Sequence, residues 1–502
     1  MQNLPDKLYR VASVIRLEQL AINQFGIAAY ELMKRAGKAV FDVVCSRYPE
    51  HKKMLVLCGA GNNAGDGYVV ARLARQAGFD VHVISLIDPA SLKNEAQLAY
   101  QDWCRVAENS AADISLINEA DIIIDALLGT GLKREVSAQW AGWINAVNKS
   151  GKPVIAIDLP SGLMADTGVI AGCAIAADIT VSFIGLKQGL FTAQAKDVCG
   201  EILFDDLAVP EEAYALVDAD ARLIKNVDYT LLPKRKASSN KGSFGHVLIV
   251  GGNTGMPGAI ILAAKAALRT GAGLVTVVTR AENLQAIVTA VPEAMVKSCD
   301  EDTLSDVLNA DFLEKITHVA IGMGLGQENW SQLMLRFCAS LNKPMLIDAD
   351  ALNLLAKNRD IKITSPLVIT PHPGEAARLL STASVLNSAD IQADRFTAIR
   401  QLFQMFADSE SCAVILKGSG SLMFDGQTIK VCALGNAAMA APGMGDVLSG
   451  IVIALMAQKI ETGAAAELAV CLHAAAAQSI TQDKTRGLLA SDVINELAKV
   501  IQ

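Results

Sequence analysis

The sequence has few charged and few aromatic side chains, and its cysteines follow no pattern. Only 19% of the 502 residues are charged and 5% are aromatic, whereas 52% are hydrophobic. The net charge is −8 and no Lys/Arg run forms a basic stripe, which argues against non-specific nucleic-acid binding. The ten cysteines include no C-x-x-C pair. This excludes a regular disulfide framework and predicts a reducing compartment, the cytoplasm.

Two membrane signals are also missing. The N-terminal stretch MQNLPDKLYRVASVIRLEQL has no apolar core, so we expect no secretory signal. No apolar run reaches about 18 residues, so we expect no transmembrane helix and no membrane partner. The chain is too long for one ordinary domain, and two domains of roughly 220–280 residues are expected.

Short apolar strands alternate with helical stretches in both halves. After a helical segment from about Val11 to Val44, the first half has buried strands in KKMLVLC, DVHVISL, ADIIIDA, GKPVIAID and ADITVSF. The second half restarts at HVLIV and continues through LVTVVT, THVAIG, KPMLIDAD, LVIT and CAVIL. This alternation predicts right-handed βαβ units and a parallel sheet in each half. The pattern weakens over residues 208–233, which places two domains at residues 1–218 and 228–502.

Polar residues follow the strands of the first half, where parallel sheets bind ligands. The loop GAGNNAGDG leads into a helix expected at about 65–71, and its N–H groups suit a phosphate, although a simple tight turn is the alternative. Asp125 and Asp158 each end a strand. One such aspartate is often only a cap or a loop anchor. Two on one sheet edge, with Asn63 and Ser161 nearby, make a cluster of oxygen donors that could hold a cation alongside a base.

Two strand ends of the second half carry weaker signals. His372, in PHPGE, is either a structural histidine or a ligand contact at the expected edge. Residues 417–421, KGSGS, join two strand-like segments. Their glycines let the backbone approach a phosphate or a ribose, but a plain hairpin has the same pattern.

The stretch APGMGDVLSG carries the clearest chemistry. Residues 443–445 would present backbone N–H groups at a helix N-terminus, which is an anion hole. Asp446 lies beside them, and the helix end is expected to favour its ionised form. An ionised carboxylate there can take a proton from a hydroxyl that attacks a phosphoryl group. The alternative is a capping aspartate after a Pro-Gly turn.

The whole chain resembles the bifunctional NAD(P)H-hydrate repair enzymes. The first half is similar to the NAD(P)HX epimerase domain in GAGNNAGDGYVVARLA, DALLGTGL, AIDLPSGL and FIGLKQGLF. The second half is similar to the ADP-dependent NAD(P)HX dehydratase domain in KGSFGHVLIVGGNTGMPGAIILAAKAALRTGAGLV, HPGE, KGSGS and PGMGDVLSG. The resemblance implies an α/β fold with an N-terminal Rossmann-like three-layer sandwich and a C-terminal ribokinase-like domain. One departure is Ala64, where the family more often has glycine; it should be tolerated unless the position needs a positive φ.

The resemblance also implies an activity. NADHX and NADPHX are hydrates of NADH and NADPH with R and S epimers. The first domain would epimerise them with K⁺, and the second would dehydrate the S form with Mg²⁺ and ADP, by phosphorylating the ring hydroxyl and eliminating phosphate. The partners would be these hydrates, an adenine nucleotide and other copies of the chain. Two alternatives remain: the second domain as an ordinary small-molecule kinase, and the first as a non-catalytic nucleotide-binding or partner-binding module.

By the same similarity, particular residues receive roles. The expected catalytic residues are Asp158, which would also contact the ring, and Asp446. The hydrate in the first domain would be held by Asn62, Asn63, Ala64, Gly65, Asp66, Gly129, Thr130, Gly131, Leu132, Lys133, Arg134 and Glu135. K⁺ would be bound by Asn63, Asp125 and Ser161. The hydrate in the second domain would touch Ala259, Gly324, His372 and Asp446. The nucleotide would be bound by Lys417, Gly418, Ser419, Gly420, Ser421 and Gly445.

Overall fold

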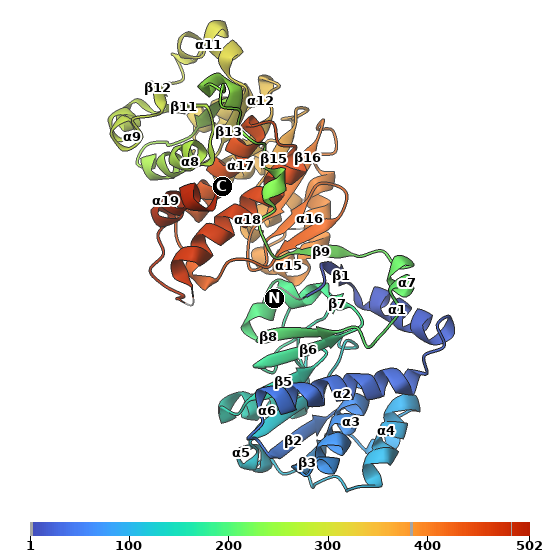
Figure 1. Cartoon of the computed structure of the whole chain (residues 1–502). Coiled ribbons are helices and arrows are strands. Elements are labelled where there is room, and N and C mark those ends of the chain that lie inside the picture. The colour runs from blue at the N-terminus through green and yellow to red at the C-terminus, as the bar shows by residue number, and fades with distance from the viewer. Residues whose placement is uncertain (1–3, 382–384, 483, 502) are drawn as a thin grey trace. The chain divides into compact units, whose positions relative to one another are not determined.

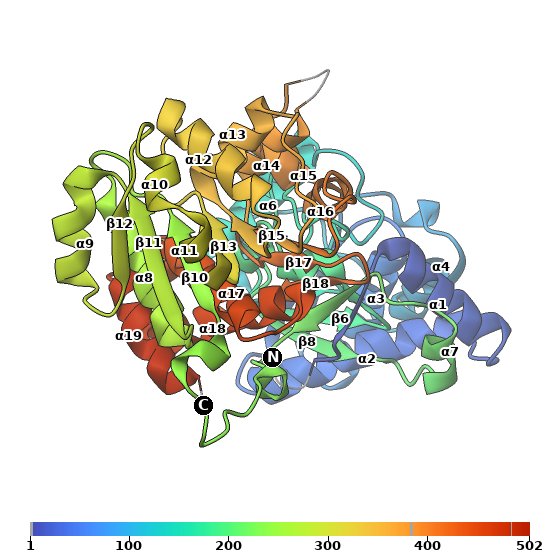
Figure 2. The same cartoon turned by 90° about the horizontal axis from the view of Figure 1, so that it is seen from above.

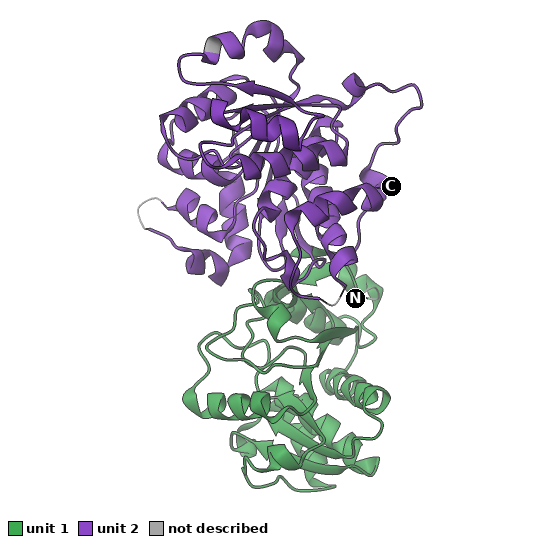
Figure 3. Ribbon diagram, turned by 90° about the vertical axis from the view of Figure 1, so that its left-hand side faces the viewer, with its two compact units in different colours: residues 1–223 green, residues 224–502 purple. Residues whose placement is uncertain are grey.

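The structure is a computed structural model that describes residues 4–381, 385–482 and 484–501. The chain divides into two compact units, the first ending at Leu223 and the second beginning at Ile224 (Figure 3). This division lies inside the 208–233 region where the strand–helix pattern weakens. Each unit is built around its own parallel sheet.

Unit 1 contains the six-stranded parallel sheet β3-β2-β4-β5-β6-β8 (Figure 1). Three further short strands, β9, β1 and β7, pair with one another beside it. The strands of unit 1 are β1 (Lys7–Tyr9), β2 (Lys53–Cys58), β3 (Asp80–Ser85), β4 (Ile122–Ala126), β5 (Val154–Ile157), β6 (Ile179–Phe183), β7 (Leu186–Lys187), β8 (Glu201–Asp205) and β9 (Ala221–Ile224), whose last residue is the first of unit 2. The helices are α1 (Val11–Asn23), α2 (Ala29–Arg47), α3 (Asn62–Gln76), α4 (Asn94–Cys104), α5 (Leu116–Glu119), α6 (Ala138–Ser150) and α7 (Glu211–Ala215).

Alternate side chains along these strands pack into two separate hydrophobic cores. One core packs α2, α3 and α4 on one face of the sheet, and the other packs α5 and α6 on the opposite face. This confirms the three-layer sandwich. The helical segment expected from about Val11 to Val44 is instead two helices, because the chain turns at Gly26, which has a φ of +71°.

Unit 2 contains a sheet with the order β12-β11-β10-β13-β14-β15-β16-β17-β18. The seven strands from β12 to β16 are parallel; β17 adds antiparallel to β16, and β18 adds antiparallel to β17. The strands are β10 (His246–Val250), β11 (Leu274–Thr279), β12 (Met295–Ser298), β13 (His318–Ile321), β14 (Met345–Ile347), β15 (Leu367–Ile369), β16 (Cys412–Leu416), β17 (Leu422–Phe424) and β18 (Ile429–Cys432).

Helices cover both faces of this sheet as well (Figure 2). They are α8 (Pro257–Thr270), α9 (Leu284–Ala290), α10 (Leu304–Val307), α11 (Ala310–Lys315), α12 (Asn329–Ser340), α13 (Ala349–Lys357), α14 (Pro373–Leu380), α15 (Ser388–Ala393), α16 (Arg395–Gln404), α17 (Met444–Ala457), α18 (Thr462–Thr481) and α19 (Ala490–Val500). One core contains α8, α17, α18 and α19. Among the described residues, α18 alone is long and apolar enough to span a membrane, but 61% of its apolar window is buried inside the protein, as in a core helix.

Strand order fixes where each unit can bind a ligand. In unit 1 the chain runs from β2 outward to β3 and then back to β4 on the other side of β2. In unit 2 it runs from β10 outward to β11 and β12 and then back to β13 on the other side of β10. The loops after β2 and β4, and those after β10 and β13, therefore diverge and leave a crevice at the carboxyl edge of each sheet.

Each unit is expected to fold without the other, because each has its own sheet and its own cores. Cutting the chain between Lys225 and Asn226 keeps β9 with its partner β1 in the first fragment. Each purified fragment should show α/β circular dichroism and a cooperative melt. Fragments that stay unfolded while the intact chain melts cooperatively would contradict two independent units.

Candidate functional site

A cavity of about 570 Å³ opens at the carboxyl edge of the unit 1 sheet. It lies at the crevice between the loops that follow β2 and β4, and α1 and α2 supply apolar walls. Ten of the predicted residues line it: Asn62, Asn63, Asp66, Gly129, Thr130, Gly131, Leu132, Lys133, Arg134 and Asp158. Ala64 and Gly65 are buried in α3 and do not line it, nor does the exposed Glu135.

The glycine loop after β2 is shorter than expected, because α3 already begins at Asn62. Gly61, with a φ of +81°, is its N-cap residue. The predicted binding residues 62–66 therefore form the first turn of a helix, whose free N–H groups face the cavity edge and suit an anion. Ala64 lies in a right-handed helix with no positive φ, so the extra methyl group is tolerated there.

Two of the predicted oxygen donors, Asp125 and Ser161, are in contact. The hydroxyl of Ser161 donates to Asp125 Oδ1 at 2.5 Å and its backbone N–H donates to Oδ2 at 2.7 Å. Asn63 is buried, a Cβ built on Gly129 would lie 3.2 Å from its Cβ, and its Nδ2 has no hydrogen-bond partner among the described residues. Burial raises the pKa of Asp125 to about 6, despite the hydrogen bonds from Ser161 and Leu127. Burial disfavours the ionised form of Asp125, and a bound cation would stabilise that form.

Asp158 has a partner that the sequence interpretation missed. Lys187, in β7, is 1% exposed and forms an ion pair with Asp158 Oδ1, which also accepts from Phe183 N at 3.2 Å. Asp158 has a φ of +67°, which is unfavourable for a residue other than glycine. The fold therefore holds one carboxylate in a strained position, paired with a buried ammonium group at the cavity wall. A lysine inside the apolar stretch FIGLKQGLF was the available signal.

Two more carboxyl groups face the same cavity. Burial raises the pKa of Asp66 well above its ordinary range, and Asp158 and Glu18 raise it further. Burial, followed by the charge of Glu95, also raises the pKa of Glu18 in α1. The cavity thus combines two carboxyl groups of raised pKa with the Asp158–Lys187 ion pair. Glu18 lies far from every motif in the sequence, so pattern reasoning could not find it.

In unit 2, the stretch from Pro442 begins α17 as expected. Gly443 is the N-cap residue with a φ of +83°, and a Cβ there would lie 2.5 Å from Leu262 Cδ1 in α8. Only glycine fits this turn both sterically and conformationally. Met444, Gly445 and Asp446 form the first turn, so their N–H groups lack partners from within the helix. This is the predicted anion-binding helix end.

The charge on Asp446 differs from the expectation. The helix end was expected to favour the ionised carboxylate, but burial raises the pKa of Asp446 to about 7, with a further contribution from Asp348 and opposition from Lys417. Desolvation therefore outweighs the helix dipole at this site. A carboxyl group with a pKa near neutrality can both accept and release a proton, which is the property of a general base.

Lys417 and Asp348 form an ion pair beside this turn. Lys417 Nζ lies 2.7 Å from Asp348 Oδ1, and Ser449 Oγ donates to Asp348 Oδ2 at 2.7 Å. A Cβ built on Gly445 would lie 3.4 Å from Lys417 Nζ, so the predicted nucleotide residues Lys417 and Gly445 lie near each other. Burial raises the pKa of Asp348, but Lys417 and the hydrogen bonds outweigh it, and the pKa stays below its ordinary range. Asp348 ends a predicted strand, but its pairing with Lys417 was not predicted.

His372 has a structural role as well as a place at the edge. It is the N-cap residue of α14, and its Nδ1 accepts from Gly374 N at 3.0 Å. Its Nε2 lies 3.1 Å from Glu375 Oε1, whose other oxygen is 3.8 Å from Lys417 Nζ. His372 is therefore connected through Glu375 to the Lys417 ion pair; the structure shows its structural role, and its contact with a ligand stays a prediction.

Residues 417–421 join the antiparallel strands β16 and β17, so the hairpin exists. Arg395 is fully buried beneath it and donates to the carbonyl oxygens of Leu416, Lys417 and Gly420 at 3.1–3.4 Å. A Cβ on Gly418, whose φ is +140°, would lie 2.5 Å from Arg395 Nη1. The buried guanidinium group therefore fixes the loop's backbone, which leaves a rigid surface for a ligand.

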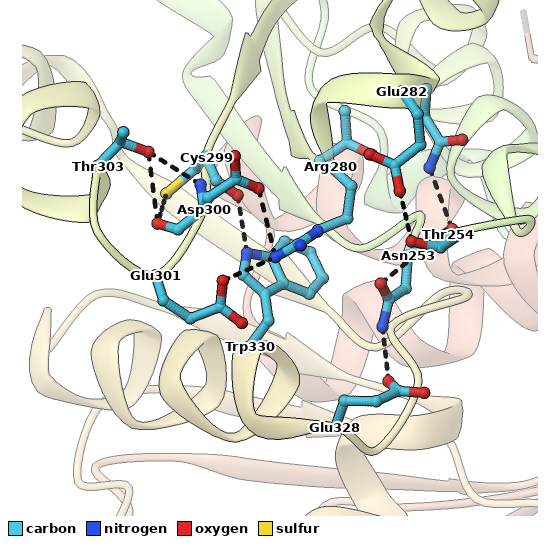
Figure 4. A network of polar contacts seen from close by, with 12 residues as sticks. Asn253, Thr254, Arg280, Glu282, Cys299, Asp300, Glu301, Thr303, Glu328 and Trp330 are labelled. Atoms are coloured by element: carbon cyan, nitrogen blue, oxygen red, sulfur yellow. Dashed lines mark hydrogen bonds and ion pairs between the residues drawn. The ribbon is translucent and has the colours of Figure 1, made fainter.

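Ala259 and Gly324 lie next to each other at the crevice between the loops after β10 and β13. A Cβ built on Gly324 would lie 3.1 Å from the Cβ of Ala259. Asn253, after β10, donates from its backbone to Gly324 O at 2.7 Å and from Nδ2 to Glu328 Oε2 at 2.6 Å (Figure 4). Asn253 therefore ties the loop after β10 to the loop after β13.

A second part of this network lies beside it. Figure 4 shows Arg280 extending along Trp330 toward Asp300 and Glu301. Its Nη1 lies 3.3 Å from Asp300 Oδ1 and 3.0 Å from Glu301 Oε2, and Trp330 Nε1 donates to Cys299 O at 2.8 Å. Because two carboxylates already neutralise Arg280, we assign this cluster to the support of the strand ends.

Known proteins resemble both units. The NAD(P)H-hydrate dehydratase family model matches residues 247–499, and the YjeF-related protein N-terminus model matches residues 29–189. A solved ADP/ATP-dependent NAD(P)H-hydrate dehydratase from Bacillus subtilis, co-crystallised with ATP and Mg²⁺, is 29% identical. The match covers 54% of this chain and 94% of the dehydratase chain, with a TM-score of 0.48.

Full-length relatives have the same two parts in the same order. The bifunctional NAD(P)H-hydrate repair enzyme of Vibrio cholerae is 44% identical over 99% of both chains. The enzyme of the same name from Escherichia coli is 41% identical over 99% of this chain and 95% of its own. The chain therefore belongs to the family of bifunctional NAD(P)H-hydrate repair enzymes.

Proposed function

We propose that unit 1 interconverts the R and S epimers of hydrated NADH and NADPH, and that unit 2 dehydrates the S epimer at the expense of ADP. One observation carries the second part: a glycine turn at a helix N-terminus, a carboxyl group with a pKa near 7 and a buried ammonium group occur together at one edge of the sheet. These are the groups that phosphoryl transfer to a hydroxyl requires.

The dehydration follows from that geometry. The ring hydroxyl attacks the β-phosphorus of ADP, AMP leaves with the electron pair, and Asp446 takes the hydroxyl proton. The N–H groups at residues 443–445 stabilise the charge on the phosphoryl group during transfer. The carbon–oxygen bond then breaks with its electrons on phosphate, which is a far better leaving group than hydroxide, and the neighbouring ring carbon releases a proton, so that its C–H electrons re-form the ring double bond. Lys417 and the loop held by Arg395 bind the nucleotide.

Mg²⁺ would enter with the nucleotide. Within the described parts of the chain, no group of three or more histidine, cysteine or acidic side chains is placed to hold a metal alone. Mg²⁺ commonly keeps waters and binds through substrate phosphates with one or two carboxylates. The acidic groups Asp348, Glu375 and Asp446 around the single ammonium of Lys417 leave a negative site that fits such a cation. When bound, Mg²⁺ would neutralise charge on the phosphates.

Epimerisation would use the cavity of unit 1. Asp158 lies at the wall in its ion pair with Lys187, and Asp66 provides a neutral acid nearby. An acid that protonates the ring hydroxyl and a base that activates water can exchange the hydroxyl between the two faces of the ring. The helix end at residues 62–66 and the loop at 129–134 would hold the phosphates and sugars.

K⁺ would bind beside that cavity. Asp125, Ser161 and Asn63 supply one carboxylate, one hydroxyl and one amide, which are oxygen ligands suited to a hard monovalent cation. The raised pKa of Asp125 fits this assignment. When bound, K⁺ would supply a fixed positive charge at the cavity edge.

The cation assignment gives a prediction. Asn63→Ala or Asp125→Ala should weaken K⁺ activation and slow epimerisation by about 10-fold or more, because loss of a direct ligand should cost at least the roughly 10–100-fold that loss of an outer-shell partner typically costs. Dehydration of pure S hydrate by the same proteins should continue at the normal rate and serves as the internal control. Epimerisation that is indifferent to K⁺ and to both substitutions would contradict the site.

The pKa of Asp446 gives a second prediction. A base must be ionised, so kcat/KM for dehydration should rise with pH up to about 7, falling about tenfold for each pH unit below that value. The measurement is the initial rate of NADH appearance at low substrate concentration across about pH 5.5–8.5, with buffers of constant ionic strength. A flat profile over this range would show that no such group controls the reaction.

One experiment tests the whole assignment. The chain is incubated with mixed NADHX epimers, Mg²⁺ and either ADP or ATP, and the products are separated by chromatography. NADH formed together with phosphate supports the dehydratase, whereas a stable phosphorylated product would indicate an ordinary kinase. Loss of the R epimer from the same mixture supports the epimerase, and its persistence would leave unit 1 as a binding module.

The setting of the protein is also part of the proposal. All ten cysteines are free thiols, two of them exposed at Cys45 and Cys104, which fits a reducing cytoplasm. We assign the chain to that compartment as a homo-oligomer, with hydrates and adenine nucleotides as its partners. Size-exclusion chromatography with light scattering measures the oligomeric state directly.

A further inference from the structure

Three elements of unit 2 meet at the ammonium group of Lys417. Its Nζ, just after β16, lies 2.7 Å from Asp348 Oδ1, just after β14, and 3.8 Å from Glu375 Oε2 in α14. A Cβ on Gly445, in the first turn of α17, would lie 3.4 Å from Nζ and 3.7 Å from Asp348 Oδ2. A side chain at position 445 would occupy the space next to the ammonium, and the glycine leaves it open.

The ion pair is asymmetric. The Asp348 side chain is 2% exposed, whereas that of Lys417 is 19% exposed, so the anion is enclosed and the cation reaches the opening. Ser449 Oγ donates to the second oxygen of Asp348 at 2.7 Å and fixes the carboxylate from behind. An ammonium group has three donors. Asp348 takes one, and Glu375 is too distant for a full hydrogen bond, so donor capacity remains toward the first turn of α17.

We propose that Lys417 holds the transferring phosphoryl group itself, and that Asp348, supported by Ser449, positions its ammonium under the amides of residues 443–445. The inference rests on the proposed phosphoryl transfer in unit 2, and it assigns the ammonium group of Lys417 to the transfer step. Charge in such transfers spreads over the three equatorial phosphoryl oxygens, and lysine acts on phosphate as a point charge. The ring hydroxyl bonds to the β-phosphorus as the bond to AMP breaks. Asp446 takes the proton, and Lys417 stays protonated.

A simpler explanation is that Lys417 is only the counterion that allows Asp348 to be buried. The two explanations differ in what removal of the charge does to catalysis. A counterion affects folding stability and leaves the rate per folded molecule nearly unchanged. A phosphoryl ligand affects kcat more than the KM for ADP, because its contact is strongest in the transition state.

The test compares Lys417→Met, Asp348→Asn and the double variant in the full-length chain. Lys417→Met should lower kcat about 10²–10³-fold, as for loss of one charge-stabilising donor, with a much smaller change in the KM for ADP. Asp348→Asn should lower kcat about 10–100-fold through a misplaced ammonium. The double variant should be no slower than Lys417→Met alone, because Asp348 acts through Lys417. It also removes both charges of the Lys417–Asp348 pair, and Glu375 keeps its hydrogen bond from His372 N, so the double variant is expected to fold.

The matched control is another ion pair of unit 2. Lys430 Nζ lies 2.9 Å from Glu467 Oε2, and the two side chains are 20% and 16% exposed. Lys430→Met with Glu467→Gln removes an equivalent pair away from the site and should leave kcat unchanged. Circular dichroism melts of all variants give the folded fraction used to correct the rates.

A second readout does not need hydrate turnover. Mg²⁺, AMP and tetrafluoroaluminate together mimic the nucleotide with its phosphoryl group in transit, and their binding is measured by calorimetry. Lys417→Met should weaken this complex about 10²-fold or more and bind AMP alone within about threefold of wild type. Normal binding of the mimic, or a kcat within about threefold of wild type, would overturn the proposal. A wild-type chain that binds the mimic but forms no NADH would instead overturn the proposed function.

Discussion

Replacing Asp446 with asparagine is expected to slow dehydration of S hydrate by about 10²–10⁴-fold, or roughly 3–5 kcal/mol of barrier. Asparagine keeps the size of the side chain and removes the base that must take the hydroxyl proton. Nucleotide binding should remain, because the amides of residues 443–445 and the loop at 417–421 provide those contacts. Epimerisation by unit 1 should be unchanged. The measurement is NADH formation from purified S hydrate and ADP, with calorimetry for ADP binding.

The matched control is Asp492→Asn. Asp492 lies in the first turn of α19 and accepts from Leu489 N at 3.0 Å, so it is a capping carboxylate of the same unit without the glycine turn. Asparagine caps a helix about as well as aspartate, so this variant should be fully active. If Asp446→Asn were also nearly as active as wild type, Asp446 would be a capping residue and the catalytic assignment would be wrong.

The second large effect is expected in unit 1. Asp158→Asn should lower R-to-S exchange by about 10²–10³-fold, because it removes the charged member of the acid–base group at the cavity wall. The single change also leaves Lys187 buried without its anion, which typically costs about 3–5 kcal/mol of stability. The double variant Asp158→Asn with Lys187→Met restores charge balance, so any remaining loss of exchange belongs to chemistry. Exchange is followed by chromatography of the two epimers.

Asp178→Asn provides the comparison for Asp158. Asp178 precedes β6 at the opposite edge of the same sheet, where its Oδ2 accepts from Val154 N at 2.8 Å. Its substitution should leave exchange intact, as should dehydration of pure S hydrate in every unit 1 variant. Fast exchange by the well-folded double variant would remove Asp158 from the mechanism.

The layers and the sheet edges could be predicted from the sequence, because buried parallel strands are short apolar runs whose polar ends mark the ligand side. Asp125 and Asp158 were located in this way, whereas Asp446 was located from the glycine turn that precedes an apolar helix. The predicted three-layer sandwich of unit 1 is confirmed. The helix break near Gly26 and the early start of α3 at Asn62 were missed, because short turns depend on local backbone geometry that periodicity does not report.

The partners of the site residues were harder to predict. Lys187 and Asp348 matter because of what lies opposite them in space, and the residues that they pair with are 29 and 69 positions away in the sequence. The ionised form expected for Asp446 was wrong for the same reason. The helix end is visible in the sequence, whereas the desolvation that dominates its pKa comes from packing of distant elements. The binding roles of the individual residues stay predictions.

The raised pKa of Asp446 also has a thermodynamic side. In the unfolded chain this carboxyl group would ionise near pH 4, and in the folded unit it ionises near pH 7. Between these values the folded state holds a proton that the unfolded state has released, so this one group makes stability decline as the pH rises. Below about pH 4 both states hold the proton, so this group makes stability independent of pH there. Above about pH 7 neither state holds it, and the loss of stability from this group is complete. Above about pH 7, where the base is ionised, this one group therefore lowers the stability of the folded unit most, and a bound nucleotide with its cation would stabilise the folded unit there.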